Sequence, residues 1–384
     1  MYVEHSSVFM PLTRSSDKHY IVRFRTISGN SPHPEAGCDH FTFEGPSAVT
    51  RCETSIWGDT IAVLIVSEEV MENKFRVYNW RTGVTTMVCP CRGQRYVLTT
   101  FQGADSIYDY SLLTPQLVLA AYPLEDGVAL SILSPDSQHT CTLYLPELYD
   151  AVYEEVHSLH DTRATGCYDS TFVPRPVGYS YSPNCNLIAF GISIIHDDDD
   201  NVERVSEELF LVLNRVSLIN LISKLSEGMP AHCLWRDWSP GITRWLPSLY
   251  GHWRCSLFGW RIVMLGEPGN SMKQLDLWGF KIMNTERPRF NEHGEEERLL
   301  MVDFNPYQFR NLTGGEDGPL SAYYDPEKTV QFTSSGSVWH PWLDEILTDQ
   351  MPCRVWVAKE PIDVAAVGIA EDTIVGFQVC KQVS

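Results

Sequence analysis

Long hydrophobic runs are missing from this sequence of 384 residues. No uninterrupted apolar stretch approaches the ~18–20 residues that a membrane-spanning helix needs, so we expect no membrane segment. The first twenty residues include Glu4, Arg14, Asp17 and Lys18, and they lack the apolar core of a secretory signal. These absences predict a protein of the cytoplasm or the nucleus.

Basic residues are also scarce. The chain carries 29 Lys and Arg against 49 Asp and Glu, which gives a formal net charge of −20 and a pI near 4.9. Such a charge repels nucleic-acid phosphates and anionic lipid headgroups, and no dense stripe of Lys and Arg offsets it locally. We therefore expect neither nucleic acid nor a membrane as a partner. A protein partner with a basic patch would fit, because complementary potentials speed encounter.

The cysteines show no pairing pattern. Eleven are scattered along the chain, and an odd number with irregular spacing is typical of reduced, mostly buried thiols. The closest pair, Cys89 and Cys91, lacks the two-residue spacer and the second pair of a zinc site. The acidic run His196–Asp200 lacks the spacing and the glycine of a calcium-binding loop, so we interpret it as a solvated loop. The sequence predicts no metal and no cofactor.

Common catalytic signatures are absent as well. The sequence contains no Walker loop, no Rossmann glycine fingerprint, no Gly-x-Ser-x-Gly elbow and no His-Glu-x-x-His zinc helix. We therefore predict a protein without enzymatic activity.

Aromatic residues are plentiful, with 17 tyrosines and 11 tryptophans, and they suit the half-buried surfaces of β-sheets. The clearest pattern is the unit Ile56–Val88. Its apolar run Thr60–Val66 is long enough for one buried strand, Lys74–Trp80 alternates polar and apolar residues, and Val84–Val88 completes a third strand.

The alternation in this unit predicts how its side chains point. Phe75 and Val77 should share one face of the sheet, with Asn79 continuing the same alternation. A tight turn should follow, because Gly83 tolerates the positive φ that such turns require. Strand, loop, strand, tight turn and strand is the order found in a propeller blade.

Weaker versions of this unit recur about every 45–65 residues, somewhat longer than the ~40–50 residues of common propeller repeats. We therefore predict an all-β, β-propeller-like fold of about five to seven blades, formed as a single domain over residues 36–384. Residues 1–35 are polar, and we expect a poorly structured segment with a strand over Tyr20–Ile27.

Two stretches interrupt the strand pattern, and we predict two short inserted helices there. Pro146–Thr162 carries Leu148, Val152, Val156 and Leu159 at helical spacing. Val216–Glu227 repeats that spacing, and Gly228-Met229-Pro230 would end the helix.

The unit over residues 58–88 resembles a blade motif in the C-terminal regions of fungal F-box proteins. Its hallmarks are Gly58-Asp59 before the first strand and the turn Tyr78-Asn79-Trp80-Arg81-Thr82-Gly83 after the second. Five further segments resemble the same family in the same order: Cys141–Leu148, Leu211–Arg215, Trp235–Pro240, Val302–Pro306 and Glu371–Gly376. The resemblance covers roughly residues 50–380.

The resemblance implies the substrate-recognition half of an F-box protein, which binds another protein through a propeller-like region. The F-box itself is missing, because Leu145-Pro146-Glu147 lies in the middle of the chain. Ubiquitin-ligase subunits are therefore expected as partners only if an F-box is missing from this gene model.

The densest aromatic cluster supplies the candidate binding residues: Trp235, Trp238, Trp245, Trp253 and Trp260. Burial is their default interpretation, and exposed members would be contact residues because tryptophan contributes strongly to binding energy.

Two alternatives remain open at this stage. A glycosidase-like propeller would gather acidic residues at one mouth of its channel, with four candidates: Asp59, Asp109, Asp276 and Asp303. A degenerate structural protein would fold without binding anything.

Overall fold

The computed structural model describes residues 8–9, 12–16, 19–26, 31–44, 51–67, 72–89, 107–124, 127–134, 141–149, 151–159, 187–197, 204–225, 232–247, 255–266, 281–282, 298–304, 329–338, 347–358, 366–369 and 374–377. Strands dominate these residues, which confirms the mainly-β prediction. Neither described helix is long and apolar enough to cross a membrane. The chain divides into two compact units: a first unit of Met1–Leu145, Arg163–Pro183 and Leu225–Cys233, and a second unit of Pro146–Thr162, Asn184–Lys224 and Leu234–Ser384.

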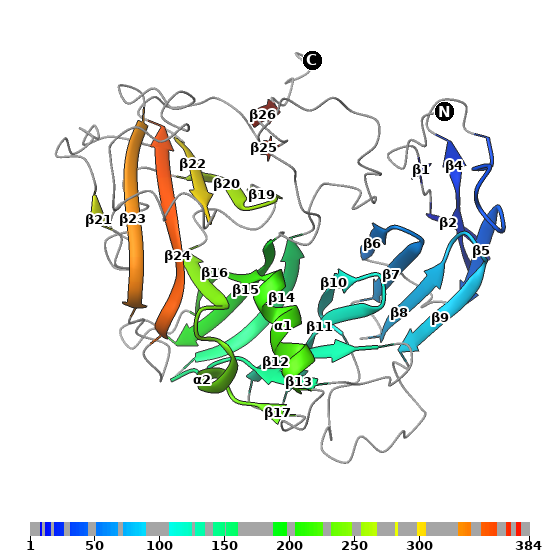
Figure 1. The fold of residues 1–384 in the computed structure, drawn as a ribbon. Coiled ribbons are helices and arrows are strands. Elements are labelled where there is room, and N and C mark those ends of the chain that lie inside the picture. Colours follow the sequence, from blue (N-terminus) through cyan, green and yellow to red (C-terminus); the bar gives the residue numbers. More distant parts are fainter. Residues whose placement is uncertain are drawn as a thin grey trace. The chain divides into compact units, whose positions relative to one another are not determined.

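The first unit contains four sheets among its described residues (Figure 1). Their strands, in sheet order, are β1 (Val8–Phe9) and β4 (Arg25–Thr26); β2 (Leu12–Ser16), β3 (His19–Arg23) and β5 (His40–Glu44); β6 (Arg51–Trp57), β7 (Thr60–Ser67), β8 (Glu72–Asn79) and β9 (Val84–Cys89); and β10 (Asp109–Thr114), β11 (Leu117–Leu124), β12 (Gly127–Leu133), β13 (Cys141–Tyr144) and β17 (His232–Cys233). All neighbouring strands are antiparallel except β13 and β17, which are parallel.

The second unit contains three sheets and two helices among its described residues. Its strands, in sheet order, are β14 (Ala151–Leu159), β15 (Leu187–Asp197), β16 (Arg204–Asn214) and β18 (Thr243–Pro247); β19 (Cys255–Phe258), β20 (Arg261–Gly266), β22 (Arg298–Asp303), β24 (Leu347–Ala358), β23 (Thr329–Val338) and β21 (Lys281–Ile282); and β25 (Ala366–Ile369) and β26 (Ile374–Phe377). The helices are α1 (Arg215–Leu225) and α2 (Trp235–Trp238).

Strand β7 explains why the first unit forms a stack of sheets. Successive side chains of a strand point to opposite faces. Ile61, Val63 and Ile65 pack into one core cluster, whereas Ala62 and Leu64 pack into another. Both faces of the sheet β6–β9 are therefore buried, which is why this strand reads as a continuous apolar run in the sequence.

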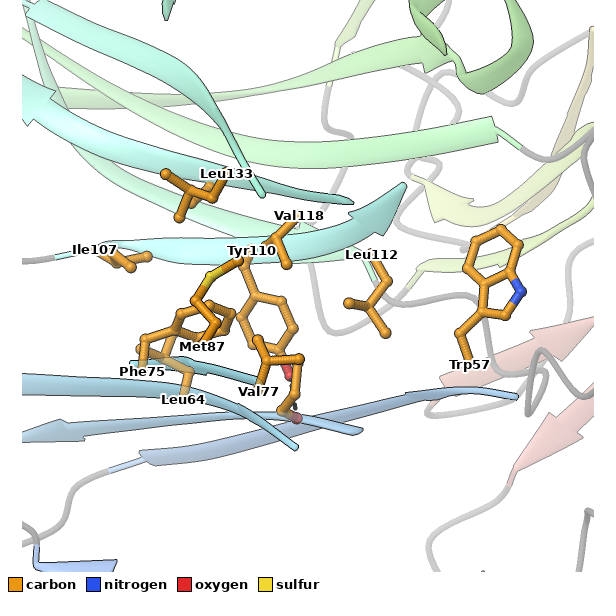
Figure 2. Close-up of a cluster of buried hydrophobic side chains, with 12 residues drawn as sticks. Trp57, Leu64, Phe75, Val77, Met87, Ile107, Tyr110, Leu112, Val118 and Leu133 are labelled. Carbon is orange, nitrogen blue, oxygen red and sulfur yellow. Dashed lines mark hydrogen bonds between the residues drawn. The ribbon is translucent and has the colours of Figure 1, made fainter. Parts of the chain in front are cut away.

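The cluster between the sheets β6–β9 and β10–β13 is built around aromatic residues (Figure 2). Phe75 and Val77 share this face, as predicted. The ring centroids of Phe75 and Tyr110 lie 4.8 Å apart, and the Tyr110 hydroxyl donates a hydrogen bond of 2.8 Å to the Ala62 carbonyl. Each fully buried apolar side chain of this kind contributes about 1.5–3 kcal/mol to folding.

The opposite face of the sheet β6–β9 packs against the N-terminal strands. Tyr20, Val22 and Phe24 are buried there. The Phe24 ring meets Phe41 edge-on at 5.1 Å, and Phe41 stacks on Tyr78 at 4.3 Å. The strand expected near residues 20–27 is present as β3 and β4. The described part of residues 1–35 also supplies core residues and the strands β1 and β2.

The first predicted helix is wrong. Its central residues form β14, which pairs antiparallel with β15 over its whole length, and residues 150 and 160–162 lie outside the described part of the chain. A bulge between Tyr153 and Glu155 shifts the register, so the buried positions are Val156 and Ser158, whereas Val152 is 63% exposed. The spacing of apolar residues suited a helix, but pairing with a long neighbouring strand outweighed it, and β-branched valines favour strands.

The second predicted helix is confirmed as α1. The Asn214 side chain accepts a hydrogen bond of 3.1 Å from the Ser217 amide, which caps the helix where β16 ends. Leu218, Ile222 and Leu225 are buried at helical spacing. The glycine and proline expected to end the helix lie outside the described residues.

The six-stranded sheet of the second unit has its own core. Val263 and Leu265 on β20 pack with Met301 on β22, Trp356 on β24 and Val367 on β25. Alternate residues of neighbouring strands therefore meet on one face, as in the first unit.

Candidate functional site

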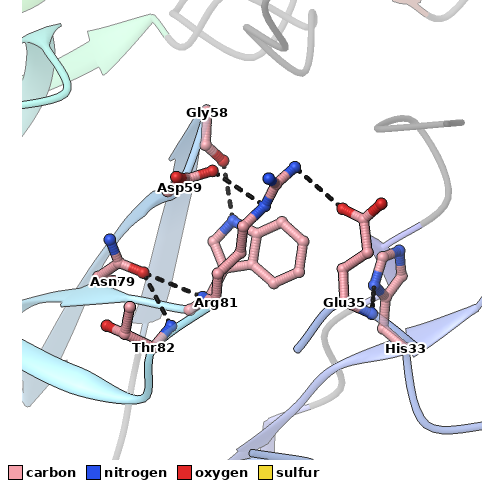
Figure 3. A network of polar contacts seen from close by, with 8 residues as sticks. His33, Glu35, Gly58, Asp59, Asn79, Arg81 and Thr82 are labelled. Carbon is pink, nitrogen blue, oxygen red and sulfur yellow. Dashed lines mark hydrogen bonds and ion pairs between the residues drawn. The ribbon is translucent and has the colours of Figure 1, made fainter. Parts of the chain in front are cut away.

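The turn between β8 and β9 is the best-defined polar feature of the first unit (Figure 3). The Asn79 side-chain oxygen accepts hydrogen bonds from the amides of Arg81, at 3.1 Å, and Thr82, at 3.0 Å. The Asn79 carbonyl accepts from the Gly83 amide at 2.9 Å, and Gly83 has the predicted positive φ of 76°. Asn79 therefore holds the turn closed, as asparagine commonly does in tight turns.

Trp80 joins this turn to the neighbouring hairpin. Its indole N–H donates a hydrogen bond of 2.8 Å to the Gly58 carbonyl, and its backbone amide donates to the Asp59 carbonyl at 2.9 Å. The side chain is 1% exposed and meets the His33 ring edge-on at 5.2 Å. The Trp80 ring is packed and its indole N–H is hydrogen-bonded, so its burial leaves no polar group unsatisfied.

Arg81 extends the cluster to the surface. Its guanidinium makes ion pairs with Asp59, at 3.0 Å, and Glu35, at 2.9 Å, and lies 5.3 Å from the Trp80 ring centroid. The three charged side chains are 33–49% exposed, so each ion pair contributes at most about 1 kcal/mol. The motif that carries the family resemblance therefore has a structural role in this protein.

Sequence reasoning missed the N-terminal half of this cluster. The Gly37 amide donates a hydrogen bond of 3.2 Å to the Trp80 carbonyl, and the Glu35 amide donates to the His33 ring at 3.3 Å. These residues lie more than forty positions before the turn and belong to no local pattern of their own. The structure alone shows that His33, in this polar stretch, is buried.

The candidate tryptophans fall into different environments. Trp235, Trp238 and Trp245 are at most 5% exposed, and Trp235 lies 5.0 Å from Trp238 and 6.0 Å from Trp245 between ring centroids. The structure brings these three together in a packed core, which is the default interpretation of the sequence. Trp253 lies outside the described residues.

Trp260 is the remaining candidate. It is partly exposed and forms, with Gly259, the two-residue turn between β19 and β20, where Phe258 pairs with Arg261. Its carbonyl accepts a hydrogen bond of 2.8 Å from the Phe304 amide. The backbone of this turn is thus held while the indole lies at a hairpin tip.

The candidate catalytic acids have structural partners where the structure describes them. Asp59 pairs with Arg81 as above, and an oxygen of the buried Asp109 accepts from the Tyr110 amide at 2.7 Å. Asp303 is 1% exposed and makes an ion pair of 3.3 Å with Arg261. Asp276 lies outside the described residues.

Asp303 belongs to a row of charged residues across the six-stranded sheet. It lies opposite Arg261 on β20 and opposite Arg354 on β24. Burial lowers the pKa of Arg354, and the charge of Asp303 acts against that shift. Next to Arg354, burial raises the pKa of the Cys353 thiol to about 11, which makes this sulfur a poor nucleophile at neutral pH. The row thus places charges of opposite sign side by side across three strands of the sheet.

Among the described residues, no three His, Cys, Asp or Glu side chains come close enough to hold a metal ion. One pair of buried cysteines, Cys141 and Cys233, does come together, with 4.0 Å between the sulfur atoms. The run His196–Asp200 and the segment of Cys89 and Cys91 lie partly outside the described residues.

Comparison with known proteins places the chain in no family. No family model matches it, and no curated protein does. Among solved structures, it is similar to the β-propeller domain of the Trilobed protease from Pyrococcus furiosus, at 12% identity over 94% of this chain and 84% of that one, with a TM-score of 0.33. It is also similar to TolB from Acinetobacter baumannii, at 10% identity over 93% of this chain and 65% of that one, with a TM-score of 0.32. Scores at this level do not establish a shared fold.

Proposed function

We propose that this protein is a β-propeller-like interaction module that binds another protein and catalyses no reaction. The observation that carries the proposal is the sheet β6–β9, which forms an antiparallel meander of four strands buried on both faces. A propeller blade has this construction, and propellers bind partners through the loops that such rigid blades present.

The use of polar residues supports a binding role over a catalytic one. In the described part of the chain, Asp59, Asp109 and Asp303 each support a turn or an ion pair. A glycosidase would need two carboxyl groups about 5–10 Å apart with room for substrate between them. The described acids that could serve in such a site are engaged in these structural contacts.

The partner that fits best is a protein with a basic surface. The net charge of −20 steers such a partner toward the chain and disfavours nucleic acid and anionic membranes. The proposal extends to the F-box-associated type of module, as the ordered sequence motifs imply. Ubiquitin-ligase subunits would join only through an F-box. The cytoplasm or the nucleus is the proposed location.

Within this module we propose Trp260 as a contact residue. It is a partly exposed aromatic side chain on a hairpin tip whose backbone is fixed. A rigid aromatic group at such a position gives contact area at a low cost in conformational entropy.

Affinity purification from the native cell, followed by mass spectrometry, tests the proposal. The wild type and a Val84→Ala control, which alters a 56%-exposed residue of β9, should capture the same partners. Trp260→Ala should lose them, and raised salt should release them, because charge steering is screened. An unchanged partner set for Trp260→Ala would refute the contact residue. If the wild type and both variants captured no partner, the binding function would be refuted. The alternative of a degenerate structural protein would then remain.

A further inference from the structure

Two buried cysteines meet at the edge of the five-stranded sheet of the first unit. Cys141 begins β13 and Cys233 ends β17, and their sulfur atoms are 4.0 Å apart. The parallel register places Leu143 opposite Cys233. Cys141 lies two residues before Leu143, so both cysteine side chains lie on the same face of the sheet.

We propose that Cys141 and Cys233 are a redox-sensitive pair that forms a reversible disulfide and fastens β17 to β13. The two residues are separated by 92 positions, so the bond would close a long loop. A disulfide needs the sulfurs to approach to about 2.05 Å. Cys141 and Cys233 are diagonal rather than direct neighbours in this register, and diagonal neighbours in a sheet lie about 7–8 Å apart. Closing the bond therefore needs a shift of the short edge strand β17 as well as side-chain rotation.

The chemistry needs an oxidant, and a small-molecule disulfide such as oxidised glutathione suffices. The Cys233 thiolate attacks one sulfur of the oxidant and releases its first thiolate, which leaves a mixed disulfide on Cys233. The Cys141 thiolate then attacks the Cys233 sulfur and releases the second. The two protons of the protein thiols pass to the two released thiolates, so the products are one protein disulfide and two small thiols.

Burial makes the closed pair slow to react. It raises the pKa of the Cys141 thiol to about 12, and the neighbouring Cys233 acts in the same direction. The reactive form is therefore a locally opened one. Strand β17 has two residues and lies at the edge of its sheet, where β13 is its one neighbour among the described strands, so it opens at a small fraction of the cost of unfolding.

Contacts on the other face show what the disulfide would reinforce. His232 lies opposite Thr142, and its ring is within 3.3 Å of the Tyr144 hydroxyl. This exposed contact and the two register pairs are among the interactions that hold β17 in the reduced protein. Oxidation would add a covalent bond on the buried face and prevent β17 from leaving β13.

The experiment uses the full-length reduced protein incubated with excess oxidised glutathione. Free thiols are then alkylated under denaturing conditions, and the non-reduced digest is mapped by mass spectrometry. We expect the Cys141–Cys233 link to be the principal intramolecular disulfide, with faster migration on a non-reducing denaturing gel that dithiothreitol reverses. Hydrogen exchange at residues 232–233 should slow in the oxidised form.

Two variants separate this pair from the other thiols. Cys233→Ser should abolish the gel shift, whereas Cys52→Ser, which alters a partly exposed cysteine on β6, should keep it. A different principal disulfide in the wild type would overturn the proposal. So would a glutathione adduct on Cys233 that Cys141 does not displace. The wild-type map decides the matter even if a variant fails to fold.

Discussion

Gly37→Ala tests the contact between the N-terminal segment and the β8–β9 turn. A Cβ atom at residue 37 would lie 2.1 Å from the Arg81 carbonyl oxygen and 2.9 Å from the Thr82 carbonyl carbon. Real Cβ atoms essentially never approach other atoms more closely than 3.0 Å, and here the obstacles are backbone atoms that cannot rotate away. The substitution must therefore push the two segments apart.

The change in folding stability combines two destabilising contributions and one stabilising contribution. Forced overpacking costs about 1–3 kcal/mol. Separation of the segments also weakens the 3.2 Å hydrogen bond from Gly37 to the Trp80 carbonyl, for about 0.5–1.5 kcal/mol. Alanine restricts the unfolded chain and returns about 0.4–1 kcal/mol. We expect a net destabilisation of about 2 kcal/mol.

Urea denaturation followed by far-ultraviolet circular dichroism measures this change. Gly127→Ala is the matched control, because a Cβ atom there would meet nothing within 4 Å and the unfolded-state gain is the same. The control should be neutral or slightly stabilising. Equal stabilities for the two variants, within about 0.5 kcal/mol, would refute the close approach of residue 37 to the turn.

Three further predictions use the same denaturation assay. Trp80→Phe should lower the free energy of unfolding by about 1–2 kcal/mol, because an aromatic ring is kept while the hydrogen bond to the Gly58 carbonyl is lost. Trp80→Ala should lower it by about 3–5 kcal/mol, and an unchanged stability of this variant would contradict the burial of Trp80. Asp303→Asn should cost up to about 3–5 kcal/mol by leaving Arg261 without its carboxylate, and a stability unchanged from wild type would disprove the ion pair. Stability should fall as the pH rises above ~9, and Cys141 should contribute up to about 1.4 kcal/mol per pH unit of that slope, because the folded state keeps the Cys141 proton that the unfolded chain loses. Cys141→Ala should reduce the slope by that amount, and an identical slope would count against the raised pKa.

Local patterns in the sequence were sufficient for several elements. The apolar run of β7 and the alternation of β8 predicted buried strands because side-chain direction along a strand depends only on residue order. The turn at Gly83 and helix α1 were predictable for similar reasons, since positive φ and amphipathic spacing are properties of neighbouring residues. The sequence by itself thus determined the mainly-β class and the character of these elements.

The tertiary structure alone decided the rest. The sequence of β14 predicted a helix, but pairing with β15 makes it a strand. Three of the five candidate tryptophans are core residues. The approach of Gly37 to the β8–β9 turn and the meeting of Cys141 with Cys233 join residues far apart in the chain. No periodicity within a strand or a turn encodes such contacts, because they arise only when separate sheets and edges pack together.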